Sequence, residues 1–133
     1  MSKLLEKSRS NLDAAEVLIK ERLYAPSVHC SYYSCFQHIK SIFPIYFDLT
    51  FSQIDVIVRT GKANEHAYLI RYISEQIHKN IGLIQYADFK RKIGDLKEFR
   101  VSSDYKEIEI TSDLSNKALK IAKEINEFLA EVF

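Results

Sequence analysis

Histidine and cysteine side chains gather in one short stretch of the chain, HCSYYSCFQHIK, which spans residues 29–40. It contains His29, Cys30, Cys35 and His38, and these residue types bind zinc or supply a reactive thiol. On a helix each residue advances by about 100°, so the four side chains point in different directions. Only Cys35 and His38 share a face, whereas a structural zinc site takes four ligands. The spacing argues against a metal site, and we expect neither a metal nor a cofactor.

The same stretch is also a poor candidate for a reactive thiol. A reactive thiol needs a positive neighbour and access to solvent, but Cys35 lies beside Phe36 and on the same broad face as Tyr32. Small residues alternate with the rings, and small residues let helix backbones approach closely. We therefore interpret the stretch as a packing seam between helices. The small residues are Ala25, Ser27, Cys30, Ser31, Ser34 and Cys35.

A second group of chemically capable residues lies in the segment RVSSDY, residues 100–105. Arg100 is suited to bind the phosphate of a nucleotide or RNA, with Tyr32 or Tyr33 nearby if their helix faces it. The alternative is structural. Arg100 and Asp104, one helical turn apart, would then form an ion pair that closes a helix end, with Tyr105 packed beneath it.

The segment also supplies the candidates for catalysis. Metal-free RNA cleavage needs a base, an acid and a cation for the phosphate. Arg100 is the candidate cation, and Asp104 and Tyr105 are the candidates for proton transfer. A carboxylate with an ordinary pKa of about 3.9 is a poor proton shuttle near pH 7, so we favour a protein without catalytic activity.

Composition limits the setting in which these residues work. The chain has 133 residues, which we read as one domain spanning 1–133, and 19 basic against 18 acidic residues give a net charge of +1. No strong overall field attracts nucleic acid or a membrane, although a local basic patch stays open. The two cysteines follow no secretory signal, so we expect a cytoplasmic protein with free thiols.

Apolar periodicity predicts an all-α, up-down bundle of four to five main helices built on an antiparallel hairpin. Three glycines and two prolines in the whole chain agree with long helices. A short helix capped by Thr50 with Gln53, or by Ser52 with Asp55, would run through Arg59, with Gly61 just past its end. Residues 106–110 should be non-helical. The main helices are expected at about 2–22, from the Pro26 turn to near Pro44, at 64–80, from about Tyr86 to 99 or 100, and from a cap at Thr111 or Ser112 onward.

Several of these segments together resemble the HEPN family. The resemblance begins with SRSNLDAAEVLIKERLYAPSVHCSYYSCFQHIKSIF, residues 8–43, in which residues 31–36 match a small-Tyr-Tyr-small-x-Phe run. His66, in Asn64-Glu65-His66, lies where many members have a histidine that opens the third helix. Arg100, Asp104 and Tyr105 match the Arg-x-x-x-Asp-Tyr signature of one branch of the family.

The resemblance implies an all-α homodimer that is associated with nucleotides or RNA. Members pair with a minimal nucleotidyltransferase in toxin–antitoxin systems, and a tyrosine near the active motif can accept a nucleotide, a position that Tyr105 would fill. Other members are metal-independent ribonucleases with an Arg-x(4–6)-His motif on the fourth helix. No histidine follows Arg100 in this chain. We therefore expect a non-catalytic binding module of such a system, and the alternative is a metal-independent ribonuclease toxin with an altered site around Arg100.

The motif spacing also occurs elsewhere in the chain. Six residues separate Arg22 from His29, Arg59 from His66 and Arg71 from His78. Residues seven apart lie on one face of a helix without any chemistry, so the spacing alone carries little weight. Only Arg71 and His78 lie well within one predicted helix, and we read them as part of a solvated polar face.

Overall fold

The computed structural model describes residues 2–133, and within this range the chain forms helices and no strand. The all-α prediction is therefore confirmed. The helices are α1 (Lys3–Lys20), α2 (Tyr24–Tyr46), α3 (Phe51–Gly61), α4 (Glu65–Asn80), α5 (Leu83–Tyr105) and α6 (Ser112–Val132).

Helices α1 and α2 form the predicted antiparallel hairpin. The Ser8 hydroxyl of α1 donates a hydrogen bond to the Ser34 carbonyl of α2 (2.5 Å), and the Ser27 hydroxyl donates to the Ala15 carbonyl (2.8 Å). Residue numbers rise along one helix as they fall along the other, which fixes the antiparallel direction. All four residues are buried, so small side chains occupy the contact, as the interpretation of a packing seam requires.

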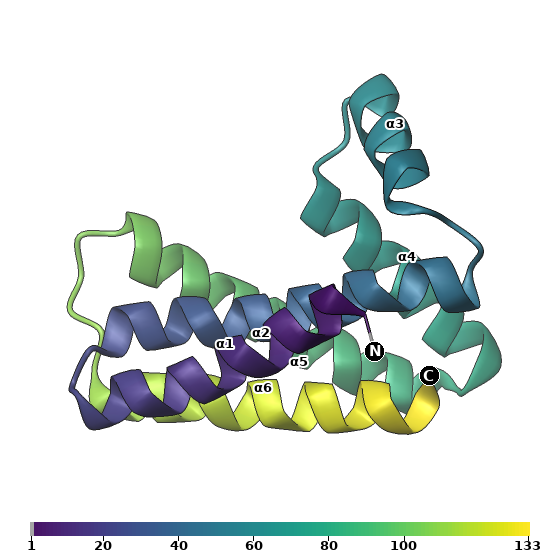
Figure 1. The fold of residues 1–133 in the computed structure, drawn as a ribbon. Helices are drawn as coiled ribbons and strands as arrows, with labels where there is room; N and C mark the ends of the chain where they lie inside the picture. Colours follow the sequence, from purple (N-terminus) through teal and green to yellow (C-terminus); the bar gives the residue numbers. More distant parts are fainter. Residues whose placement is uncertain (1) are drawn as a thin grey trace.

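Helix α2 is the centre of the bundle. It packs against α1, α4, α5 and α6, and Figure 1 shows it within the layer formed with α1 and α6. Its Tyr32, Ile39 and Phe43 side chains are fully buried. Burying such large apolar side chains stabilises the fold by roughly 1.5–3 kcal/mol each relative to leaving them exposed. This helix therefore sets the positions of the elements around it.

Helices α2 and α5 extend further than the sequence pattern predicts. Helix α2 continues to Tyr46 and includes Pro44, because a proline near the end of a helix removes only one backbone hydrogen bond and the Phe47 N–H still reaches the Phe43 carbonyl. Helix α5 begins at Leu83 and ends at Tyr105. The segment 100–105 is thus the last turn and a half of a helix, and residues 106–110 leave the helical conformation as predicted.

Helix α3 stands away from the layer of α1, α2 and α6 and contacts α4 (Figure 1). Of the two caps that the sequence predicts, the structure has the capping box of Thr50 with Gln53, and the helix does not use Ser52 with Asp55. The prediction that Gly61 follows the end of the helix is wrong, because Gly61 is the last helical residue. Lys62 takes the left-handed cap instead, with φ of 52°. Ile54 is the buried residue that anchors this helix.

Within residues 2–133, no helix alone is both long and apolar enough to cross a bilayer. Helices α2 and α3 reach that length and apolarity only when taken together, and the chain bends by 110° at the break between them.

Candidate anion-binding site around Arg100

Arg100 lies near the end of α5 with its guanidinium against the aromatic rings of α2. The guanidinium carbon is 5.0 Å from the centre of the Tyr32 ring and 5.8 Å from that of Tyr33. Both distances fall within the range of cation–π attraction. The Arg100 side chain is only 12% exposed. The structure thus brings the predicted Arg100, Tyr32 and Tyr33 together, since α5 packs across the tyrosine face of α2.

The hydrogen-bonding capacity of Arg100 is largely unused. Its Nη1 atom is 3.7 Å from Asp104 Oδ2, which is too long for a hydrogen bond. Its Nε atom is buried and has no hydrogen-bond partner among residues 2–133. Buried polar groups normally find partners, so a guanidinium in this state is suited to receive an anion.

His29 forms a hydrogen bond with the carboxylate of Asp104, the residue that the sequence pattern pairs with Arg100. Its Nδ1 atom is 2.8 Å from Asp104 Oδ2, and the Asp104 side chain is 19% exposed. The carboxylate can only accept, so Nδ1–H donates. A neutral His29 then has its lone pair on Nε2. A carboxylate that orients an imidazole in this way is the arrangement of a histidine general base.

His66, at the start of α4, completes the cluster from a third helix. The ring stacks on Phe36 with centroids 3.8 Å apart, and its Nδ1 atom is 2.7 Å from the hydroxyl oxygen of Tyr32. Burial raises the pKa of Tyr32, so the phenol keeps its proton. It has no other acceptor among the described residues and therefore donates to Nδ1. The neutral His66 ring accordingly carries its proton on Nε2.

Positive charge surrounds this histidine. Burial, followed by the charges of Arg100 and Lys97, lowers the pKa of His66, and the carboxylate of Glu65 opposes them. Lys40 also lowers it, and Lys40 forms an ion pair with Glu65. Lys97, Arg100 and Lys40 therefore place positive charge around His66, with Glu65 as the acidic neighbour.

Beside Asp104 the surface is hollowed. A pocket of about 460 Å³ opens between the first turns of α2 and the end of α5. The Ser103 hydroxyl is buried there without a partner among the described residues. The expectation that Tyr105 packs beneath an ion pair is wrong, because this residue is 74% exposed. The pocket is lined by Ala25, Pro26, His29, Cys30, Ser103, Asp104 and Tyr105.

The four candidate ligands of the opening stretch do not converge. His29 bonds to Asp104, whereas His38 bonds to Asn126 on α6. Cys35 is completely buried, and this burial raises its pKa to about 12, which is the opposite of an activated thiol. Among residues 2–133, no group of three or more metal-binding side chains is present.

Sequence reasoning missed His29 and His66 as members of the Arg100 cluster. The family motif places its histidine after Arg100 in the sequence. His29 and His66 both precede Arg100 and reach the site from α2 and α4. His66 had one usable signal, its place at the start of the third long helix. His29 also had a usable signal, because it lies four residues, or about one helical turn, before Tyr33 and so shares a helix face with it. The ring centroids of His29 and Tyr33 are 4.6 Å apart in the structure.

No protein-family model, curated protein or solved structure matches this chain.

Proposed function

We propose that this protein is a HEPN-like nucleotide- or RNA-binding module, a non-catalytic component of a cytoplasmic toxin–antitoxin or nucleotidyltransferase-paired system. The observation that carries the proposal is the state of Arg100. Its guanidinium is held against two aromatic rings, its Nε lacks a partner among residues 2–133, and the nearest carboxylate is hydrogen-bonded to His29. A phosphate supplies the missing acceptors.

The ligand groups follow from the donors present. Arg100 and the Nε2–H of His66 supply donors for phosphate oxygens, and Lys97 and Lys40 add positive charge. The exposed Tyr105 ring, whose centre is 5.8 Å from the Arg100 guanidinium, offers a face on which a base can stack. Single-stranded RNA or a free nucleotide carries both groups, so either fits this site.

The test is binding of two probes, a fluorescently labelled single-stranded RNA followed by anisotropy and ATP followed by calorimetry. Arg100→Gln should weaken binding by at least about tenfold, because a charged hydrogen bond to phosphate is lost. Arg91→Gln is the matched control, since Arg91 lies on the same helix with a 64% exposed side chain. Circular dichroism should show that both variants fold, with the melting temperature lowered by a few degrees in Arg100→Gln, which loses its cation–π contacts, and nearly unchanged in Arg91→Gln.

If both variants weakened binding equally, the loss would reflect the lower positive charge of the protein and not a site at Arg100. Loss of folding together with binding in Arg100→Gln would return Arg100 to a structural role. Arg100→Lys then separates charge from geometry, because a lysine keeps the charge without the planar fork of donors.

The alternative, a metal-independent ribonuclease toxin, is supported by the two histidines beside Arg100. His29, oriented by Asp104, has the acceptor Nε2 of a general base for the 2′-hydroxyl, and His66, once protonated to the imidazolium, would be the general acid through its Nε2–H. Arg100 would stabilise the charge that develops on the phosphate. The histidines that the sequence lacks after Arg100 are thus supplied by other helices.

Incubation of the purified protein with a fluorogenic RNA in the presence of EDTA tests this alternative. Cleavage that leaves a 2′,3′-cyclic phosphate and is lost in His29→Gln and His66→Gln, but not in His78→Gln, would replace the non-catalytic proposal. Uncleaved RNA that still binds in an Arg100-dependent manner would support the binding module.

Pairing with a nucleotidyltransferase rests on the family resemblance. The exposed Tyr105 hydroxyl is accessible to such a partner and is the proposed acceptor of a nucleotide. Mass spectrometry after co-expression with a candidate nucleotidyltransferase should find added nucleotide on the wild-type chain and none on Tyr105→Phe.

A further inference from the structure

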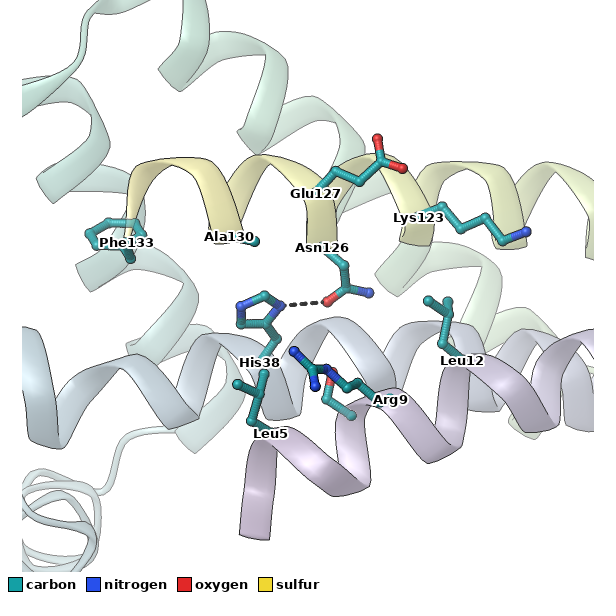
Figure 2. Close-up of a pocket in the computed structure, with 10 residues that line it drawn as sticks. Leu5, Arg9, Leu12, His38, Lys123, Asn126, Glu127, Ala130 and Phe133 are labelled. Carbon is teal, nitrogen blue, oxygen red and sulfur yellow. Dashed lines mark hydrogen bonds between the residues drawn. The ribbon is translucent and has the colours of Figure 1, made fainter. Parts of the chain in front are cut away.

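A second pocket, of about 450 Å³, lies between α1, α2 and α6 (Figure 2). It shares no lining residue with the pocket beside Asp104. Its volume is within the range of sites that bind small molecules. The lining residues are Leu5, Ser8, Arg9, Leu12, His38, Lys123, Asn126, Glu127, Ala130 and Phe133.

The polar centre of this pocket is fixed by a chain of hydrogen bonds. Asn126 donates through Nδ2 to the Ala122 carbonyl at 2.9 Å and to the Ser34 hydroxyl at 3.2 Å. Its Oδ1 atom is therefore the acceptor, and the Nδ1–H of His38 donates to it across 2.8 Å. Both amide N–H groups of Asn126 are used, so this residue offers no donor to a ligand, and its role is to hold the His38 ring as a rigid wall.

Arg9 supplies positive charge directly beside this wall. Figure 2 shows its guanidinium next to the His38 ring, and its charge, after burial, contributes to lowering the pKa of His38. The other charged groups of the lining point elsewhere. Lys123 forms an ion pair with Glu16, and the Glu127 carboxylate points away from His38 in Figure 2. An anion that enters the pocket therefore meets Arg9 first.

The remaining lining is apolar, with Leu5 and Leu12 from α1 and Ala130 and Phe133 from the end of α6. We propose that this pocket binds a small organic carboxylate, with the carboxylate on the Arg9 guanidinium and an apolar body against Leu5, Ala130 and Phe133. A guanidinium carries five N–H donors in a planar fork, so it can hold a carboxylate alongside an existing partner.

Benzoate is the probe for this site, and benzyl alcohol is its neutral counterpart. In an NMR titration of the intact protein, benzoate should shift the Asn126 side-chain amide and the backbone amides near Ala130 in a saturable manner. Benzyl alcohol should bind about tenfold more weakly or not at all, because it lacks the charge that Arg9 recognises.

Two variants and two matched controls decide the result. Arg9→Gln should weaken benzoate binding by about tenfold, and Ala130→Phe should abolish it by filling the pocket. Arg71→Gln and Ala87→Phe make the same changes at exposed positions of other helices and should leave binding unchanged. Shifts that do not saturate, equal binding of both probes, or binding that survives Arg9→Gln and Ala130→Phe would overturn the proposal.

Discussion

At the scale of single residues, Arg100 is held by aromatic rings rather than by a carboxylate. Each cation–π contact is worth about 0.5–2 kcal/mol, whereas a pair whose atoms are 3.7 Å apart forms no hydrogen bond. Asp104 bonds to His29, and Tyr105 is exposed. The contacts that would make this segment a helix-closing ion pair are therefore weak or missing, which favours the ligand-binding interpretation of Arg100.

The charge of Arg100 is expected to control the protonation of His66. Burial, followed by the Arg100 charge, lowers the pKa of His66, so removing the charge in Arg100→Gln should raise this pKa toward its ordinary value. The histidine ring signals in an NMR pH titration report the pKa directly. The change requires no ligand, so it tests the geometry of the cluster independently of its function.

Arg91→Gln is again the control, because Arg91 is not among the charges that act on His66. A His66 pKa that stays the same in Arg100→Gln would mean that the two side chains are farther apart in solution than in the structure.

The members of this cluster differ in how far the sequence could predict them. Arg100 and Asp104 are one helical turn apart, and Tyr32 and Tyr33 are adjacent, so their local relations follow from helical geometry. His29 meets Asp104 across 75 positions, and Tyr32 meets His66 across 34. Such contacts depend on how α4 and α5 cross α2, and hydrophobic periodicity carries no information about the crossing.

At the scale of elements, local chemistry predicted where helices begin better than where they end. Thr50, Asn64 and Thr111 each cap a helix through a side-chain oxygen, which is a signal contained in a few consecutive residues. The ends of α2 and α5 were predicted too early. Phe43 of α2 contacts the Tyr72 ring of α4, and Arg100 of α5 contacts the Tyr32 ring of α2. These contacts between helices stabilise the last turns, so tertiary packing overrides the local stop signals.

The left-handed cap of α3 gives a prediction at this scale. Lys62 has φ of 52°, a conformation that costs a residue with a Cβ atom more than it costs glycine. Lys62→Gly should therefore stabilise the end of α3 by roughly 0.5–1 kcal/mol. Hydrogen exchange of the α3 amides and urea unfolding measure the effect.

Lys120→Gly is the matched control, because it makes the same change at an exposed position in the middle of α6. There the substitution should destabilise the protein by about 1 kcal/mol. The same sign for both substitutions would show that the backbone conformation of Lys62 does not determine the stability of this cap.

At the scale of the whole molecule, two partly buried histidines couple folding to pH. Burial is the largest cause that lowers the pKa of both His38 and His66, so the unfolded chain binds protons at a higher pH than the folded one. Their contribution to stability is complete above the unfolded pKa of about 6.5 and is lost as pH falls through the folded values. Urea unfolding should therefore give a smaller free energy at pH 5.5 than at pH 7.5.

Substitution identifies the groups responsible for this dependence. His66→Gln and His38→Gln should each reduce the difference between the two pH values, whereas His78→Gln, which changes an exposed histidine of α4, should not. A free energy of unfolding that is equal at pH 5.5 and 7.5 in the wild-type protein would show that neither histidine is protected from protons in the folded state.

The elbow between α2 and α3 is where we expect a second copy of the chain to bind. The family resemblance implies a homodimer, and this elbow exposes Ile45 (75%) and Tyr46 at the end of α2 and Val56 on α3, the helix that stands away from the bundle (Figure 1). Aromatic and apolar side chains are enriched in the buried centres of interfaces. Light scattering at micromolar concentration should give twice the mass of the chain, and Ile45→Glu with Val56→Glu should give the monomer, because two buried charges would face an apolar surface.

Ile84→Glu changes an equally exposed residue at the start of α5 and should leave the dimer intact. A monomeric wild-type protein, or dissociation by Ile84→Glu alone, would contradict this assignment of the interface.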